Sequence, residues 1–294
     1  MTTPAMDLDR LVAIDVHAHA EISADGHPSL SAELEAGKSV YFGVERGQLT
    51  IDEMAAYYRE RAIAAVVFTV DAEAATGHPP ISNEEVADSC ARHADVLIPF
   101  ASLDPHRGPT AVRQARRLVE QHGVRGFKFH PSLQAFWPDD RLAYPLYAAI
   151  EELGMPALFH SGQTGIGAGL RGGGGIRLKY SNPMALDDVA VDFPDLTIIC
   201  AHPSVPWQDE ALAVATHKPN VYIDLSGWSP KYFPPQLVRQ ANSLLRHKVM
   251  FGSDFPAITP DRWLRDFDAL EIKEEVRPLI LKQNAIRALG LTGA

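Results

Sequence analysis

The sequence contains only two cysteines among its 294 residues, Cys90 and Cys200. Two cysteines cannot build the disulfide framework of a small secreted domain or a zinc site of the Cys-x-x-Cys kind. Positive charge is also scarce, because 27 lysines and arginines stand against 37 aspartates and glutamates, giving a formal net charge of −10. Nucleic acids and anionic membranes favour a basic protein face, so this balance argues against both as partners.

Long apolar runs are missing as well. No stretch approaches the roughly 18 apolar residues of a membrane-spanning helix. Residues 1–10 lack the basic segment and apolar run of a secretory signal, so we expect a cytoplasmic protein. Apolar residues nevertheless make up 46% of the chain, which is enough for a buried core. No repeat or linker divides the sequence, and we expect residues 1–294 to form a single domain.

Eight short apolar segments alternate with longer amphipathic ones. The short segments are continuous rather than alternating, which is typical of strands buried on both faces in a parallel sheet. The predicted strands are Val12–Val16, Ala65–Val70, Val96–Ser102, Val124–Phe129, Ala157–His160, Leu196–Ala201, Val221–Leu225 and Val249–Gly252. The predicted helices are Asp52–Ala62, Asn83–His93, Thr110–His122, Arg141–Leu153, Pro183–Val191, Gln208–His217, Pro235–Leu245, Asp261–Leu270 and Lys273–Leu289.

Eight strand–helix units predict an α/β fold, specifically a (β/α)8 TIM barrel. The chain averages about 37 residues per unit, against roughly 31 in a 250-residue barrel. The excess lies after the first strand, from Ala20 to Ile51, and after the fifth, from Ser161 to Asn182. Both are strand-to-helix connections, which lie on the face of a barrel where active sites form. An open doubly wound sheet would normally carry a glycine-rich turn after its first strand, where this chain has His17 and His19.

Histidine is abundant, with 12 in the chain. In extended backbone, residues i and i+2 point to the same face, so His17 and His19 either share a metal ion or are two unrelated polar residues. The pattern recurs, because His160, His202 and Asp254 also follow apolar runs directly. Five ligand-type side chains at strand ends indicate one metal centre.

These motifs resemble the amidohydrolase superfamily, in the branch that includes aminocarboxymuconate semialdehyde decarboxylase. The resemblance covers almost the whole chain. It rests on His-x-His at 17–19, Phe-His-Ser-Gly at 159–162, Ala-His-Pro at 201–203, Tyr-Ile-Asp-Leu-Ser-Gly at 222–227 and Phe-Gly-Ser-Asp-Phe-Pro at 251–256. It implies that one divalent metal is bound by His17, His19, His160 and Asp254. It also implies that His202 is the catalytic acid and base, a role that Asp254 could share.

Three neutral imidazoles and one carboxylate suit Zn²⁺ and tolerate Mn²⁺. Lys128, at the end of the fourth strand, leaves three interpretations open. It is the carbamylated lysine that bridges two metals in binuclear relatives, a cation that binds the substrate, or part of a structural ion pair. We favour the substrate contact, because the branch is mostly mononuclear. His130 shares the face of Lys128 and is a further candidate for substrate binding.

The segment Ser161–Asn182 is rich in glycine and carries Arg171, Arg177 and Lys179 without any acidic residue. It is either an ordinary surface loop or a lid that recognises an anionic group. Trp228 is a candidate for stacking on an aromatic substrate. The expected partner is therefore a small molecule, anionic or aromatic, and the protein is expected to be a homodimer.

The resemblance implies a metal-dependent hydrolase that activates water against an electrophilic carbonyl. The segments 129–134 and 224–230 most resemble 4-hydroxyphenyl-β-ketoacyl-CoA hydrolases, which cleave a carbon–carbon bond in hydroxycinnamate catabolism. The alternative is a non-oxidative decarboxylase of an aromatic or unsaturated carboxylic acid. A lactonase or amidase and a catalytically inactive binding scaffold are further alternatives.

Overall fold

The computed structural model describes residues 6–43 and 48–291. All the strands within these residues run parallel to their neighbours. They are β1 (Ala13–His19), β2 (Ile63–Phe68), β3 (Leu97–Pro99), β4 (Ala101–Ser102), β5 (Phe127–Phe129), β6 (Ala157–His160), β7 (Ile198–Ala201), β8 (Val221–Asp224) and β9 (Val249–Met250). Every predicted strand is confirmed, and the third is split at Phe100 into β3 and β4.

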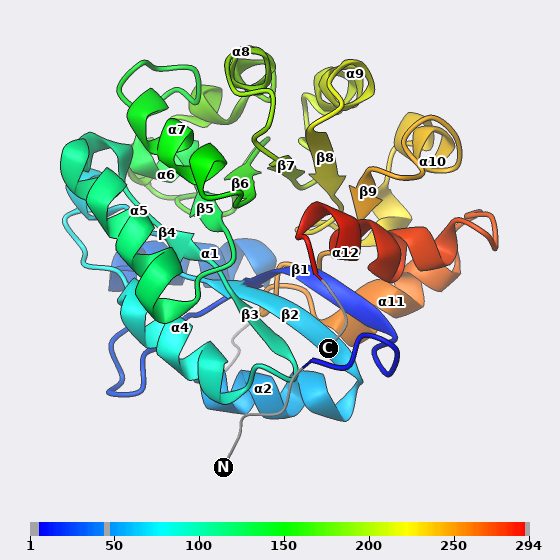
Figure 1. Ribbon diagram of the computed structural model, residues 1–294, viewed down its shortest axis with the longest axis horizontal. Helices are drawn as coiled ribbons and strands as arrows, with labels where there is room; N and C mark the ends of the chain where they lie inside the picture. Colours follow the sequence, from blue (N-terminus) through cyan, green and yellow to red (C-terminus); the bar gives the residue numbers. More distant parts are fainter. Residues whose placement is uncertain (1–5, 44–47, 292–294) are drawn as a thin grey trace.

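The strands form two ladders, one in the order β1-β2-β3 and the other running from β4 to β9. The chain passes from the first ladder to the second at Phe100, between β3 and β4. On the opposite side, Val16 N donates a hydrogen bond to Phe251 O at 3.0 Å, and Ala18 forms a bridge with Phe255. The fold is the predicted TIM barrel, with its ladder interrupted at these two places. The helices lie outside the strands (Figure 1).

Most of the predicted helices are present, with ends shifted by a few residues. The helices are α1 (Ala32–Phe42), α2 (Ile51–Glu60), α3 (Glu73–Thr76), α4 (Asn83–Arg92), α5 (Pro109–His122), α6 (Pro131–Gln134), α7 (Tyr144–Glu152), α8 (Ala185–Asp192), α9 (Gln208–His217), α10 (Pro235–Ala241), α11 (Pro260–Asp268) and α12 (Asn284–Ala288). The last predicted helix is shorter than expected, because a π-helical segment at Leu279–Gln283 precedes α12. No helix in the described part of the chain is long and apolar enough to cross a membrane.

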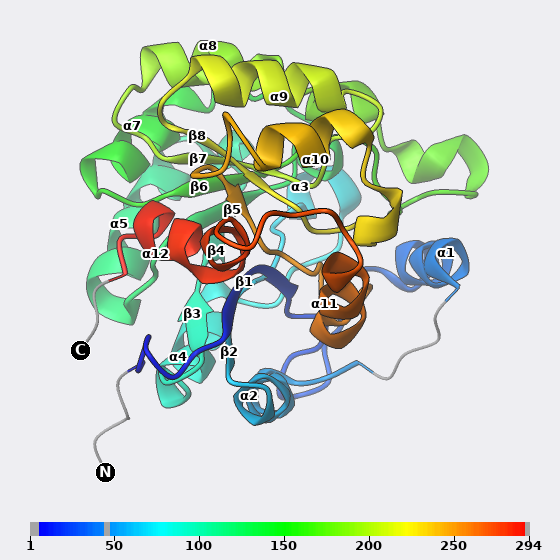
Figure 2. The same cartoon turned by 90° about the vertical axis from the view of Figure 1, so that its right-hand side faces the viewer.

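The two long connections differ from simple loops. The first contains α1, which the sequence did not predict and which lies at the right-hand edge of Figure 2. Ser31 caps the start of α1, and Gly43 ends it with a left-handed φ of 62°. Residues 44–47 of this connection lie outside the described residues. The second connection contains two short 3₁₀ turns, at Arg171–Gly175 and Leu178–Ser181.

Buried side chains fill two regions. A large cluster lies between strands and helices and includes Met54, Tyr58 and Trp263. A second cluster contains alternate strand residues such as Leu158 and Met250, the set that fills the interior of a barrel. Because the interior below is packed with apolar side chains, the polar residues that close the strands are held at one end of the barrel.

Candidate metal centre

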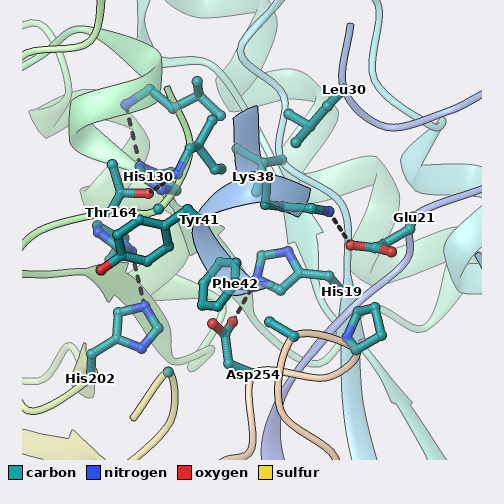
Figure 3. A pocket seen from close by; sticks show the side chains of 18 of the residues that line it. His19, Glu21, Leu30, Lys38, Tyr41, Phe42, His130, Thr164, His202 and Asp254 are labelled. Atoms are coloured by element: carbon teal, nitrogen blue, oxygen red, sulfur yellow. Dashed lines mark hydrogen bonds and ion pairs between the residues drawn. The ribbon is translucent and has the colours of Figure 1, made fainter. Parts of the chain in front are cut away.

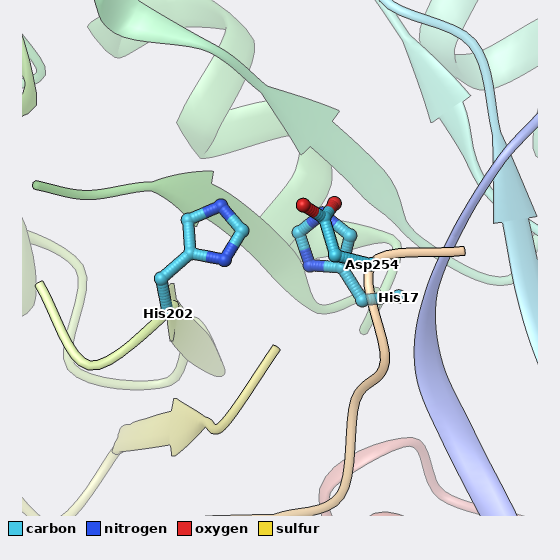
Figure 4. A group of neighbouring side chains, drawn as sticks. All are labelled: His17, His202 and Asp254. Carbon is cyan, nitrogen blue, oxygen red and sulfur yellow. The ribbon is translucent and has the colours of Figure 1, made fainter. Parts of the chain in front are cut away.

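The five side chains predicted to form a metal centre meet at the carboxyl ends of four predicted strands. Each of His17, His202 and Asp254 offers one ligand atom, and these atoms lie within 4.8 Å of one another (Figure 4). His19 Nε2 lies 3.2 Å from Asp254 Oδ1, and His160 Nδ1 lies 3.0 Å from His202 Nε2. All five residues therefore belong to one connected group.

The tightest group differs from the predicted ligand set. His202, predicted as the acid and base, completes it in place of His19 and His160. The local backbone explains this position, because His202 has a left-handed φ of 74° after the end of β7. A Cβ at residue 227 would lie 2.5 Å from His202 Nδ1, so Gly227 leaves the space that the ring needs. How the five residues divide ligand and acid–base roles stays a prediction.

Several atoms of the group fit a divalent ion. Asp224 Oδ2 lies 2.7 Å from His17 Nδ1, so Nδ1 carries the proton and the Nε2 lone pair faces the centre. His17 Nε2 and His19 Nε2 lie 3.3 and 3.2 Å from Asp254 Oδ1. Ligand atoms around one tetrahedral ion are separated by roughly 3.4 Å. The donors present thus match the predicted divalent metal in type and spacing.

The electrostatics keep His17 and His160 neutral and Asp254 ionised. Burial lowers the pKa of His17 and of His160 well below the ordinary value. Burial alone would raise the pKa of Asp254, but the hydrogen bond from His19 and the nearby His202 hold it at about 2. His160 Nε2 is buried and has no hydrogen-bond partner among the described residues. Neutral imidazoles and a carboxylate are the forms that bind metals.

Buried polar residues that sequence reasoning missed hold this group in place. Asp15 Oδ1 accepts hydrogen bonds from His17 N at 3.1 Å and Ser253 N at 2.8 Å. Asp15 Oδ2 accepts from Tyr58 OH at 2.8 Å. This carboxylate therefore joins β1, which carries His17, to the turn that carries Asp254. The position of Asp15, two residues before His17, could have identified it from the sequence.

Ser226 forms a second missed connection. Its Oγ lies 3.0 Å from His17 Nδ1 and 2.8 Å from His202 Nδ1, and its backbone N donates to Asp224 Oδ1 at 2.6 Å. Asp224 and Ser226 both lie in the motif at 222–227, whose individual residues received no role from the sequence.

Lys128 lies inside the barrel beneath the ligand group. Its Nζ lies 3.2 Å from His17 Nε2 and 4.8 Å from the centre of the Phe68 ring. Burial lowers the pKa of Lys128 to about 7. Lys128, like His17, does not line the pocket described next, and its contact with substrate stays a prediction.

A pocket of about 870 Å³, measured out to its open mouth, rises from the ligand group. His19, His160, His202 and Asp254 all line it, and His19, His202 and Asp254 are labelled in Figure 3. Its apolar and aromatic walls consist of Leu30, Tyr41, Phe42, Val70, Leu133, Ile166 and Trp228. A pocket with this lining suits a small, largely apolar molecule.

The predicted substrate residues divide into two groups. His130 and Trp228 line the pocket as predicted, and the His130 ring stacks on that of His160 with centres 3.9 Å apart. Arg171, Arg177 and Lys179 do not line it and are exposed to solvent, and their binding of an anionic group stays a prediction.

Packing explains the outward orientation of these cations. The same segment turns its apolar residues inward, and Ile166, Leu170 and Ile176 pack on the small core around Leu34 and Leu133. The charged side chains are left on the solvent side. The pocket instead receives Lys38, Tyr41 and Phe42 from the unpredicted helix α1.

A family model described as Amidohydrolase matches residues 14–291, and the chain belongs to this family. A search of proteins with curated functions found no match.

Solved structures share the fold at low identity. An uncharacterized TIM-barrel protein from Bordetella bronchiseptica is 23% identical with a TM-score of 0.77, over 95% of this chain and 98% of that one. A 5-carboxyvanillate decarboxylase from Novosphingobium aromaticivorans, with bound manganese and 3-methoxy-4-hydroxy-5-nitrobenzoic acid, is 14% identical with a TM-score of 0.68, over 98% and 99%. A probable 2-pyrone-4,6-dicarboxylic acid hydrolase from Acinetobacter baumannii, with bound citric acid, is 16% identical with a TM-score of 0.63, over 95% and 99%.

Proposed function

We propose that the protein is a metal-dependent, non-oxidative decarboxylase of an aromatic or unsaturated carboxylic acid. The observation that carries this proposal is the His17–His202–Asp254 group at one end of an aromatic-lined pocket. The metal end suits a carboxylate, and the walls formed by Phe42 and Trp228 suit a planar apolar body.

The similar structures support the decarboxylase more than the hydrolase that the sequence motifs favoured. One has manganese and a nitrobenzoic acid bound, and 2,6-dihydroxybenzoate decarboxylases also share the fold. A probable 2-pyrone-4,6-dicarboxylic acid hydrolase also shares the fold.

A divalent ion would be held by His17 and Asp254, with the remaining ligands from His19, His160 and His202. When bound, such an ion supplies positive charge that orients an anionic substrate and stabilises negative charge developed during the reaction. Manganese is the first ion to test, because the 5-carboxyvanillate decarboxylase contains it.

The chain's own residues position the acid and supply a proton. The carbon–carbon bond to the carboxyl group breaks, CO₂ leaves, and the electron pair stays on the substrate carbon, which then takes one proton. Asp254 and His202 both line the pocket, and we expect them to relay to this carbon a proton taken up from solvent. Ser226 Oγ lies within hydrogen-bond distance of His202 Nδ1, and the backbone N of Ser226 donates to Asp224. These contacts orient the His202 ring.

The test is turnover of hydroxybenzoic and cinnamic acids by manganese-loaded enzyme in D₂O. We expect CO₂ release and one deuterium at the carbon that lost the carboxyl group. His202→Gln should slow formation of the deuterated product while the variant still binds the acid, whereas Asp254→Asn should lose metal as well as turnover because Asp254 is also a predicted ligand.

A parallel reaction in ¹⁸O-labelled water tests the hydrolase. Incorporation of ¹⁸O into an aromatic acid released from a β-keto thioester, without CO₂ release from any free acid, would reject the decarboxylase in favour of the hydrolase. Failure of both reactions with fully loaded enzyme would reject both proposals.

A further inference from the structure

A charged cluster lies in the pocket wall beside the metal centre. Lys38 Nζ, from α1, is paired with Glu21 Oε1 and lies 2.9 Å from Glu35 Oε2. Lys38 and Glu21 line the pocket, and their side chains are 16% and 10% exposed. Figure 3 shows this pair on the side of the pocket opposite His202. None of the three residues has a role in the proposed reaction.

The position of Glu21 relates the cluster to the ligand group. Glu21 lies two residues after His19, just beyond the end of β1, and its pair with Lys38 lies across the pocket from His202 (Figure 3). A planar acid whose carboxyl group faces Asp254 and His202 therefore extends its far edge toward Glu21 and Lys38.

Charge and hydrogen-bonding capacity define what this cluster accepts. Two carboxylates and one ammonium carry a formal charge of −1, which opposes a second carboxylate on the substrate. An ammonium has three N–H donors, and that of Lys38 is paired with Glu21 and lies near Glu35. Lys38 and Glu21 both line the pocket, so an ammonium donor and a carboxylate acceptor lie side by side there. A hydroxyl group can donate to Glu21 and accept from Lys38 at the same time.

We propose that Glu21 and Lys38 form a substrate-recognition site for a ring hydroxyl on the side opposite the reacting acid group. The preferred substrate class is then a phenolic acid rather than an unsubstituted, methoxylated or dicarboxylic one. This inference rests on the proposed function only in placing the acid group of the ligand at the metal end.

The test measures equilibrium binding to the manganese-loaded enzyme by calorimetry. The ligands are benzoates and cinnamates with hydrogen, hydroxyl, methoxyl or carboxylate at position 4. The concentration of each ligand is measured again after the titration to show that none was consumed. Because hydrogen bonds to charged groups are strong, we expect the hydroxyl compound of at least one series to bind roughly tenfold more tightly than its unsubstituted parent. The dicarboxylate should bind most weakly.

Variants assign the preference to the two residues. In Lys38→Met and Glu21→Gln, the hydroxyl preference should fall to nearly one while the unsubstituted acid still binds. Lys38→Arg keeps the charge and should retain part of the preference. Lys231→Met, which removes an exposed lysine outside the pocket, should leave the preference unchanged.

Two results would overturn the proposal. One is the absence of a hydroxyl preference in both series of the unaltered protein, and the other is an equal loss of affinity for all ligands in Lys38→Met and Lys38→Arg. Preference for the dicarboxylate would instead identify an anion site. If the predicted order holds but no acid is decarboxylated, the proposed reaction fails and the recognition site stands. If an acid is decarboxylated but the predicted order of affinities is absent, the proposed reaction stands and the recognition site fails.

Discussion

The two ends of the pocket are held in place by different forces. We call the ligand group the floor, formed by His17, His19, His160, His202 and Asp254. We call α1 together with residues 161–182 the roof. The floor is fixed by buried hydrogen bonds that Asp15 and Asp224 accept and by those of Ser226. The roof is fixed mainly by close packing, and only a few polar contacts connect it to the barrel.

Glycine shows how the roof is assembled. A Cβ at residue 37 would lie 3.0 Å from Leu170 Cγ, and one at residue 165 would lie 2.7 Å from both Phe42 Cε2 and Tyr41 Cδ1. Gln163 Nε2 donates one hydrogen bond, at 3.1 Å, to Tyr41 OH. Because the floor supplies the ligand atoms and the roof supplies the wall, we expect metal binding and substrate preference to be separable by mutation.

Removal of a floor ligand should give the largest effect. In His17→Ala, bound manganese should fall to near zero and turnover should drop ~10³-fold, since several kcal/mol of stabilisation by the ion are lost. The roof variant Lys38→Met should keep the metal content of the unaltered protein. Metal analysis after loading and steady-state kinetics check both. Full manganese occupancy in His17→Ala would remove the distinction between floor and roof.

Loss of the carboxylate beneath the floor should destabilise the whole barrel. Asp15→Ala leaves the donors on His17, Tyr58 and Ser253 buried without their acceptor, and we expect the free energy of unfolding to fall by about 3–5 kcal/mol. Urea denaturation measures this change. Glu274→Ala, at an exposed carboxylate, should stay within about 0.5 kcal/mol of the unaltered protein. Similar losses in both variants would mean that Asp15 is not a central connection.

A milder change to the floor should weaken metal binding without unfolding. Asp224→Asn keeps the size of the side chain but removes the charge that faces His17 Nδ1. Such partners of metal-binding histidines typically contribute 10–100-fold to metal affinity, and we expect a loss of about that size. Competition with a chelator of known affinity measures it. An unchanged affinity would show that the Asp224–His17 contact does not support the ion.

The sequence predicted much of the floor because its residues obey strand geometry. His160 directly ends an apolar run, and the period of two in extended chain brings His17 and His19 together. The exact grouping was not predictable, because the position of His202 depends on a left-handed backbone conformation and on the space beside Gly227. Nothing in the local pattern of residues 201–203 encodes that turn.

The roof could not be predicted in the same way. The helix α1 has only weak amphipathic character, and its place depends on contacts with Leu170 and Gln163, which are more than 100 positions away in the chain. The cations of residues 171–179 suggested a lid that faces the substrate. The direction of these cations depends on which apolar residues of the same segment pack into a core. That packing is a property of the tertiary structure.

The smallest expected effect concerns the packing of the roof. Gly165→Ala places a methyl group against Phe42 and Tyr41, so we expect a loss of about 1 kcal/mol in stability and a change in KM, with metal content unaltered. Phe42→Leu removes one of the clashing rings. If the contact is the cause, the double variant should recover most of the loss, with a coupling energy of about 1 kcal/mol. Strict additivity of the two substitutions, or a loss of metal in Gly165→Ala, would show that the roof and floor are not independent.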